Sequence, residues 1–321
     1  MKKTLLTVML AIATTFAMAQ TYTDNLEVSI MGSKEAPQET TIVVNQASDG
    51  TYTLSLNNFI LGGAIPVGNI VIDNIATTES NGIKSFEVVR NILITADGED
   101  WIGPTLGEVP VNLIGKMDAK HLYCTINITM EELGTINVVF GNRNNFVAST
   151  STYTEQLTVA VGDDQQEPQE TTIAVETNKD GTYTLSLNNF ILGGIIPVGN
   201  IVVESIAATT KEGITSFTAN RNILIAAGDD EGEWLGPQLG EVPVNITGKM
   251  DAEHLYCTIS ITMEELGTIN VVFGEEGNVT NISGIAAENG ANVIYDLTGR
   301  RIEAITTAGI YIVNGKKVLV K

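Results

Sequence analysis

The sequence predicts an all-β protein made of two tandem antiparallel eight-stranded β-barrels and a small C-terminal β segment. Three observations carry this prediction. One long unit is written twice in the 321 residues, hydrophobic residues alternate with polar ones along most of each unit, and Gly-containing turns separate the alternating runs. Alternation with a period of two residues is typical of half-buried strands, and no window shows a convincing helical period.

The repeat is a duplication of a whole domain. Residues 49–63 (DGTYTLSLNNFILGG) return at 180–194, and residues 130–141 (MEELGTINVVFG) return at 263–274. A period this long indicates tandem domains, because solenoid units span only about 20–45 residues. Copies this similar also preserve neutral positions, so identity between them marks no functional site.

The first unit contains eight strand-like runs separated by short turns. Such a meander closes naturally into a small barrel, which also removes exposed sheet edges. A β-sandwich of the same strands is the main alternative. The short MEEL stretch at 130–133 is expected to be a bulge or a single helical turn. The predicted strands are 22–31, 40–46, 51–60, 69–77, 83–95, 108–117, 121–130 and 134–141.

The N-terminus has the three parts of a secretory signal peptide. Lys2 and Lys3 precede a mostly apolar run at 5–16, and Ala17-Met18-Ala19 offers small residues for cleavage. This run is shorter than the roughly 20 residues that span a bilayer. We therefore expect a mature chain that begins near Gln20, has no transmembrane segment, and is periplasmic, on the cell surface or extracellular. No cysteine follows the cleavage site, which argues against a lipoprotein anchor.

Repeat and composition together divide the chain into five segments. The second unit ends in a polar, Gly-containing linker, after which the composition becomes weakly basic and three or four short strands are expected. The expected segments are the signal peptide 1–19, barrel 1 at 20–148, barrel 2 at 149–277, the linker 278–284 and the C-terminal β segment 285–321.

The charge of the chain argues against a nucleic-acid partner. It carries 38 Asp and Glu against 17 Lys and Arg, a net charge of −21. Affinity for nucleic acid depends on basic side chains that neutralise phosphates, and an anionic membrane requires a basic face as well. The excess acid is interpreted as a solubilising surface charge.

The stretch HLYCTI contains all the histidine and cysteine of each unit. On a strand, Cys124 shares a face with Leu122, Ile126 and Ile128, whereas His121 points to the opposite face. A Cys/His pair within hydrogen-bond reach is therefore excluded within one unit. We expect Cys124 and its counterpart Cys257 to be free and buried, with no disulfide, because they belong to different barrels.

Four residues are candidates for ligand contacts. Trp101 and Trp234 are the only tryptophans, each in a W-(I/L)-G-P loop between strands, where they would either contact a ligand at the barrel mouth or close the end of the barrel. Arg90 and Arg221 interrupt apolar runs. Each would either meet an anionic ligand or pair with a carboxylate at the rim. For both pairs the structural role is the favoured interpretation.

No motif indicates catalysis, a cofactor or a metal. Each unit offers one His and one Cys that point apart, whereas transition-metal sites draw several such ligands. The acidic loops at 97–100 and 229–233 lack the regular spacing of a calcium loop. No nucleophile elbow, zinc-protease motif or phosphate loop occurs. We therefore expect a protein that is not an enzyme and has no cofactor, no metal site and no catalytic residue.

Several motifs, taken in order, resemble the calycin-like domains of secreted Bacteroidetes proteins. They are TYTLSLNNF, PVGNIV, W(I/L)GP, LGEVPVN, GKM and GTINVVFG. This resemblance covers nearly all of each unit and implies a lipocalin-related barrel. It implies no catalytic motif, and ligand binding inside the barrel would be an analogy of fold alone.

The C-terminal segment resembles the sorting domain of the Bacteroidetes type IX (Por) secretion system. VIYDLTGRRI at 293–302, GIYIVNGKKV at 309–318 and the final Lys321 carry this resemblance. It implies that the secretion machinery is a partner. The segment is shorter than the usual sorting domain.

Two functions follow as alternatives. The first is a non-catalytic protein that binds a small apolar or amphipathic ligand in its barrels. The second is a structural or adhesion-type surface protein whose barrels are filled by large aliphatic side chains, as eight-stranded barrels can be. They differ in one measurable property, because an internal ligand requires a cavity of roughly 300 Å³ or more.

Overall fold

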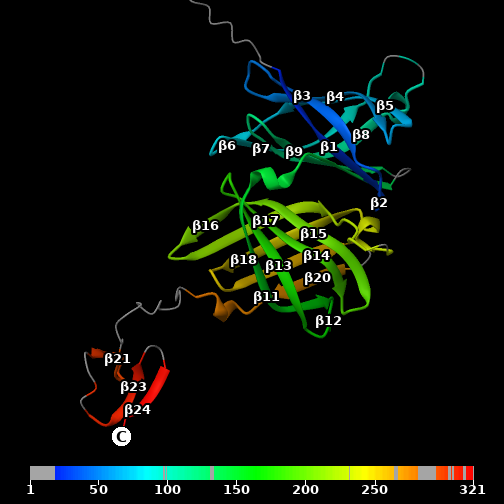
Figure 1. Cartoon of the computed structure of the whole chain (residues 1–321). Coiled ribbons are helices and arrows are strands. Elements are labelled where there is room, and N and C mark those ends of the chain that lie inside the picture. Colours follow the sequence, from blue (N-terminus) through cyan, green and yellow to red (C-terminus); the bar gives the residue numbers. More distant parts are fainter. Residues whose placement is uncertain are drawn as a thin grey trace, which may run out of the picture.

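The computed structural model contains three antiparallel sheets and confirms the all-β fold class (Figure 1). Two sheets have ten strands each, and the third, near the C-terminus, has four. The structure describes residues 19–96, 98, 100–130, 134–230, 232–263, 267–280, 294–302, 305, 307–313 and 316–320. The expected signal peptide, apart from residue 19, and most of the MEEL stretch and of the linker lie outside these residues.

Barrel 1 follows the predicted meander closely. The strand order is β5-β4-β3-β1-β10-β9-β8-β7-β6, with the short β2 paired to β1. Eight long strands correspond to the eight predicted runs, and the two short strands were not predicted. The strands are β1 Gln20–Ile30, β2 Ser33–Lys34, β3 Gln38–Gln46, β4 Tyr52–Leu61, β5 Ile65–Ile75, β6 Thr78–Ser80, β7 Ile83–Leu93, β8 Glu108–Met117, β9 Leu122–Met130 and β10 Gly134–Phe140.

The strands at the two ends of the sheet order of barrel 1 meet along a seam. Here β5 and the end of β7 are joined by a bridge between Asn69 and Thr95, whose two backbone hydrogen bonds measure 2.6 and 3.1 Å. The 3-10 helix η1 (Gly103–Leu106) lies over this end of the seam, where the Ile102 N–H donates to the carbonyl of Pro66 at 2.9 Å. The sheet therefore curls into a barrel, as predicted, rather than splitting into a sandwich.

The interior of barrel 1 holds the side chains of one parity. Leu54, Leu56, Val109, Val111 and Leu113 are all buried, and they alternate with outward-facing neighbours as the two-residue period requires. Burial of such side chains, each contributing roughly 1.5–3 kcal/mol, is the main force that holds the barrel together.

Three register shifts in the β4–β5 hairpin were not predicted. One lies between Leu56 and Phe59, where Asn58 takes a positive φ of 52° and its N–H donates to Asn69 Oδ1 at 2.8 Å. Asn tolerates this left-handed conformation better than most residues, and a bulge adds the twist that a closed barrel needs. Asn189 and Asn200 repeat the device in barrel 2.

Barrel 2 has the same topology, with the order β15-β14-β13-β11-β20-β19-β18-β17-β16 and a seam bridge between Asn200 and Ala226. The 3-10 helix η2 (Arg143–Phe146) links the two barrels. The strands are β11 Val147–Val161, β12 Asp164–Gln165, β13 Gln169–Asn178, β14 Tyr183–Leu192, β15 Ile196–Ile206, β16 Ala208–Lys211, β17 Ile214–Leu224, β18 Glu241–Met250, β19 Leu255–Met263 and β20 Gly267–Phe273.

The C-terminal segment forms its own small sheet in the order β22-β21-β23-β24. This agrees with the expected three or four short strands, which are β21 Ile294–Tyr295, β22 Arg301–Ile302, β23 Gly309–Val313 and β24 Lys316–Val320. Among the residues that the structure describes, no helix is long and apolar enough to cross a membrane.

Candidate functional site at the interface between the barrels

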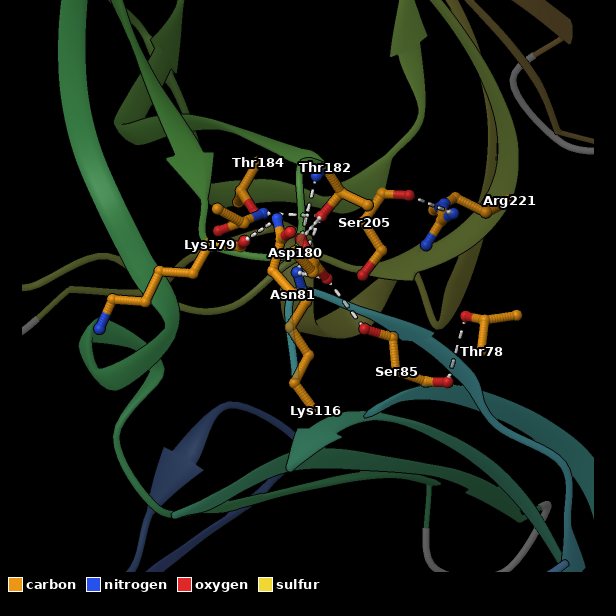
Figure 2. A network of polar contacts seen from close by, with 11 residues as sticks. Thr78, Asn81, Ser85, Lys116, Lys179, Asp180, Thr182, Thr184, Ser205 and Arg221 are labelled. Carbon is orange, nitrogen blue, oxygen red and sulfur yellow. Dashed lines mark hydrogen bonds and ion pairs between the residues drawn. The ribbon is translucent and has the colours of Figure 1, made fainter. Parts of the chain in front are cut away.

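A hairpin turn of barrel 2 lies against the outer surface of barrel 1 (Figure 2). The turn connects β13 to β14, and Gly181 at φ 88° allows it to close tightly. Asp180 Oδ1 accepts hydrogen bonds from the backbone N–H and the hydroxyl of Thr182, at 3.0 and 2.7 Å. These local bonds fix the carboxylate, so that its second oxygen points toward barrel 1.

A buried ion pair joins this turn to barrel 1. Lys116 Nζ lies 2.8 Å from Asp180 Oδ2, which also accepts a hydrogen bond of 2.8 Å from the Ser85 hydroxyl. Only 6% of the Lys116 side chain and 3% of the Asp180 side chain are exposed. Burial raises the pKa of Asp180, but the hydrogen bonds from Lys116 and Thr182 outweigh it and lower that pKa below its usual value.

A second cluster of charges crosses the interface at η2, the helix that links the two barrels. Arg143, in η2, contacts Glu176 at 3.0 Å and Glu204 at 3.3 Å, and the Tyr123 hydroxyl of barrel 1 donates to Glu204 at 2.7 Å. Burial and the charge of Glu204 raise the pKa of Tyr123 well above its usual value. An apolar contact of Ile83, Tyr123 and Phe146 packs beside this cluster.

A cleft of about 170 Å³ remains between the barrels. Apolar side chains such as Ile114, Val139 and Leu224 line it, together with Asn, Thr and Glu side chains and the two arginines Arg143 and Arg221. The Arg221 side chain is 14% exposed, and its Nε and Nη1 atoms are buried without a hydrogen-bond partner. Its contacts are long, 3.4 Å from Nη2 to the Ser205 carbonyl and 4.0 Å from Nη1 to Glu87.

The two candidate arginines occupy equivalent positions with different partners. Arg90 reaches across the seam of barrel 1 from β7 to β5, where its Nη1 contacts Asp73 at 2.5 Å. Glu204 is the counterpart of Asp73 in barrel 2 but pairs with Arg143 and Tyr123. Because Glu204 makes its contacts across the interface, Arg221 lacks the carboxylate partner that Arg90 has in Asp73.

The two candidate tryptophans lie in the loops at the end of each seam. Trp234 is buried against Gly228, where an added Cβ would meet the indole ring at 2.1 Å, and its Nε1 donates to the Asp230 carbonyl at 3.2 Å. Trp101 is half-buried beside Gly98. Both rings pack on their own loops, and neither lines the barrel cavities described below.

The cysteines and histidines of HLYCTI separate as the strand period predicts. Cys124 and Cys257 are free and fully buried, and burial raises the pKa of each thiol to about 12. His121 and His254 are partly exposed at the starts of β9 and β19. His254 Nδ1 lies 2.8 Å from Glu155, and this hydrogen bond raises its pKa.

Little space remains inside the barrels. The cavity of barrel 1, lined by side chains such as Leu26, Leu54 and Phe140, measures about 20 Å³. The cavity of barrel 2, lined by residues such as Phe190, Val203 and Ile246, measures about 70 Å³. A single water needs about 10–15 Å³ and a small-molecule site about 300 Å³ or more.

No group of three or more His, Cys, Asp or Glu side chains within the described ranges is arranged to hold a metal ion. Asp97 and Glu99 in the first acidic loop, and Glu231 in the second, lie outside those ranges.

Sequence reasoning missed the interface between the barrels. Its signal lay in the positions where the two copies differ. Arg143 corresponds to Glu276, Glu176 to Asn45 and Phe146 to Val279. These three interface residues each have a counterpart of different charge or size. Motifs shared by the two units therefore do not include them.

Two solved structures show a distant likeness to the chain. No curated protein matches the chain. A solved structure from Bacteroides fragilis NCTC 9343, provisionally described as an outer membrane protein, is 16% identical, with 80% of this chain and 97% of that chain covered and a TM-score of 0.28. A protein of unknown function from the DUF3598 family of Nostoc punctiforme PCC 73102 is 9% identical, with 79% and 94% covered and a TM-score of 0.24.

Neither of these distant likenesses bears on function. The family model described as calycin-like beta-barrel domain matches residues 18–143 and again residues 150–276, which together make up most of the chain. The chain therefore belongs to the calycin-like β-barrel family and carries two tandem domains of it.

Proposed function

We propose that this chain is a secreted, non-catalytic structural or adhesion-type protein of the cell surface, whose barrels act as rigid building blocks rather than ligand carriers. The single observation that carries the proposal is the filled interior of each barrel, at about 20 and 70 Å³. A small apolar or amphipathic ligand would have to displace core side chains in either barrel, and overpacking a core typically costs about 1–3 kcal/mol.

The buried interface supports the same proposal. Two barrels joined only by a flexible linker would move independently, whereas the Lys116–Asp180 pair and the Arg143 cluster fix them against each other. Breaking a buried ion pair by removing one partner costs about 3–5 kcal/mol, which favours a single docked arrangement. The signal-like N-terminus and the type IX sorting-like tail agree with export from a Bacteroidetes cell.

Native mass spectrometry of the protein purified from its host tests this proposal. We expect the mass of the mature polypeptide alone, with no small molecule retained in stoichiometric amount. Each measurement would be repeated after denaturation, so that covalent modifications are distinguished from bound molecules. One apolar molecule released per barrel would contradict the proposal and restore the internal-ligand alternative.

A second candidate function rests on Arg221. Its side chain lines the cleft of about 170 Å³, and its Nε and Nη1 atoms have no hydrogen-bond partner. Because the cleft is smaller than a full small-molecule site, only the carboxylate end of an anionic molecule such as an acidic monosaccharide would enter it. A carboxylate would supply the acceptors that this guanidinium lacks, and charge-assisted bonds of this kind are among the stronger ones.

Titration with glucuronate, followed by NMR, tests this second candidate. We expect shift changes at residues around the cleft, abolished in Arg221→Gln and retained in the matched variant Arg90→Gln, whose site lies on the seam of barrel 1. Equal shifts in the wild-type protein and Arg221→Gln would exclude the cleft as the binding site.

A further inference from the structure

The duplication gives each barrel both halves of the interface that joins them. One half is the Asp-Gly-Thr turn, at 180–182 in barrel 2 and 49–51 in barrel 1. The other half is the docking face, formed by Ser85, Lys116 and Tyr123 in barrel 1 and by their counterparts Ser216, Lys249 and Tyr256 in barrel 2. Within the chain, the turn of barrel 2 occupies the face of barrel 1. In the part of the chain that the structure describes, Asp49 bonds only within its own turn, and Lys249 pairs with Glu276, so the remaining turn and face are not joined.

The turn of barrel 1 already has the geometry that docks in barrel 2. Asp49 Oδ1 accepts from the N–H and hydroxyl of Thr51 at 3.0 and 2.7 Å, the same distances as in the docked turn. Gly50 has φ 90°, and Gly181 has φ 88°. Asp49, however, is exposed to solvent, whereas Asp180 is buried.

The docking face of barrel 2 is more exposed to solvent than that of barrel 1. Lys249 is 28% exposed against 6% for Lys116, and Tyr256 is half-buried whereas Tyr123 is buried. A shallow groove of about 720 Å³ runs over this face and is lined by Ser216, Lys249 and Tyr256 among others. Lys249 pairs with the exposed Glu276 at 3.5 Å, and surface pairs of this kind hold weakly.

The backbone follows the same path after the last strand of each barrel. The Gly141 N–H donates to the Asn25 carbonyl at 2.9 Å before η2, and the Gly274 N–H donates to the Gln156 carbonyl at 3.0 Å before η4 (Glu276–Asn278). Phe146 and Val279 are buried at matching positions. A further barrel could therefore follow barrel 2 as barrel 2 follows barrel 1.

We propose that a second copy of this chain supplies that barrel. The 49–51 turn of one copy docks on the Ser216, Lys249 and Tyr256 face of the next, with Asp49 Oδ2 accepting from Lys249 and Ser216. This contact is heterologous, so it extends head to tail into a filament or closes into a ring. The inference deepens the structural role proposed above by naming the partner, and it rests on that proposal only for its biological meaning.

Contacts between copies are weaker than those within the chain, for two reasons. The counterparts of Arg143, Glu176 and Glu204 are Glu276, Asn45 and Asp73. None of these three is basic, so they cannot pair with one another, and docking would bring the acids Glu276 and Asp73 close together. Two copies also lack a covalent linker, which within the chain supplies an effective concentration on the order of millimolar. Assembly is therefore expected at high local concentration, as on a crowded cell surface.

Sedimentation velocity of the full mature chain, from about 10 μM to about 1 mM, tests the proposal, this being the range of weak interfaces. We expect a concentration-dependent rise in sedimentation coefficient. Asp49→Ala and Lys249→Ala should each remain monomeric, whereas the control Asp163→Ala, at an exposed turn elsewhere on barrel 2, should associate like the wild-type protein.

Mixing the two defective variants gives the sharpest result. Lys249→Ala retains its turn and Asp49→Ala retains its face, so an equal mixture should form a dimer and stop there. A wild-type chain that stays monomeric throughout the range, or a mixture that does not dimerise, would overturn the proposal.

A carbodiimide cross-link identifies the occupant of the face. We expect Lys249 joined to Asp49 of another copy. A Lys249 link to the C-terminal segment would assign the face to that segment instead and also overturn the proposal. Retained small molecules in native mass spectrometry would contradict the structural function without affecting these outcomes.

Discussion

At the scale of single residues, burial decides the chemistry of the duplicated cysteines. Both thiols are fully buried, and burial raises their pKa to about 12. The thiolate is the reactive form, so neither cysteine is a nucleophile near neutral pH. We expect no reaction of the native protein with a disulfide reagent at pH 8 and reaction of two thiols per chain in guanidinium. Rapid labelling of one thiol in the native protein would show that a barrel opens locally.

The duplicated histidines have different acidic neighbours. Glu155 accepts a hydrogen bond from His254 at 2.8 Å, whereas its counterpart in barrel 1 is the shorter Asp24. This bond raises the pKa of His254 above its usual 6.5. The pair therefore contributes stability that is complete below about pH 6.5 and is lost as the pH rises through the raised pKa.

Glu155→Gln tests this assignment. We expect it to lower the pKa of His254 in an NMR titration of the ring protons and to remove the corresponding pH dependence of stability. An unchanged titration of His254 would mean that Glu155 is not its partner in solution.

At the scale of strands, equivalent glycines, Gly115 in β8 and Gly248 in β18, allow the side chains of the neighbouring strands to pack closely. A Cβ at Gly115 would lie 2.5 Å from the Phe86 ring on β7 and 2.7 Å from the Cys124 Cβ on β9. We expect Gly115→Ala to destabilise barrel 1 by about 1–3 kcal/mol, the usual range for overpacking. Urea unfolding measures the change.

A second substitution separates this overpacking from other effects. Phe86→Leu removes the ring that the new methyl group meets, so the double variant should lose less stability than the two single changes added together. Simple additivity of the two losses would mean that the ring is not the obstacle.

Elements of this fold could be predicted because the sequence alternates so regularly. Each of the eight runs falls within a few residues of an observed strand, since burial of one face fixes the parity of residues such as Leu54 and Val111. The bulge at Asn58 escaped prediction, because a bulge needs one local bond, from its N–H to Asn69 Oδ1, that leaves no periodic trace. Arg90 could be recognised as an exception in its run, but its partner Asp73 lies across the seam.

At the scale of the whole molecule, the contact between the barrels could not be predicted from one unit. Its residues lie on outward faces, where the sequence tolerates any polar side chain, and only the difference between copies distinguishes Glu204 from Asp73. Docking also places equivalent residues of the two units in different environments. Asp49 and Asp180 occupy identical turns, yet one is exposed and the other is buried against Lys116. Identity of sequence therefore does not imply identity of role.

This pair of aspartates provides a test of what holds the barrels together. The folded-state pKa of Asp180 is lower than the ordinary 3.8, so its contribution to docking is complete above about pH 4 and is lost as the pH falls through the lowered pKa. Asp180→Asn keeps the turn, because the amide oxygen accepts the same bonds from Thr182. The docked state of this variant would, however, bury the charge of Lys116 with no carboxylate to neutralise it. We expect a loss of about 3–5 kcal/mol at neutral pH, with a smaller difference from the wild-type protein in acid.

Asp49→Asn is the matched control, since it makes the same change in the same turn at an exposed position. Urea unfolding of both variants at neutral and acidic pH, together with small-angle scattering of the native proteins, measures stability and the arrangement of the barrels. We expect only Asp180→Asn to separate the barrels. An equal effect of the two substitutions would show that the turn, and not its contact with Lys116, is what matters.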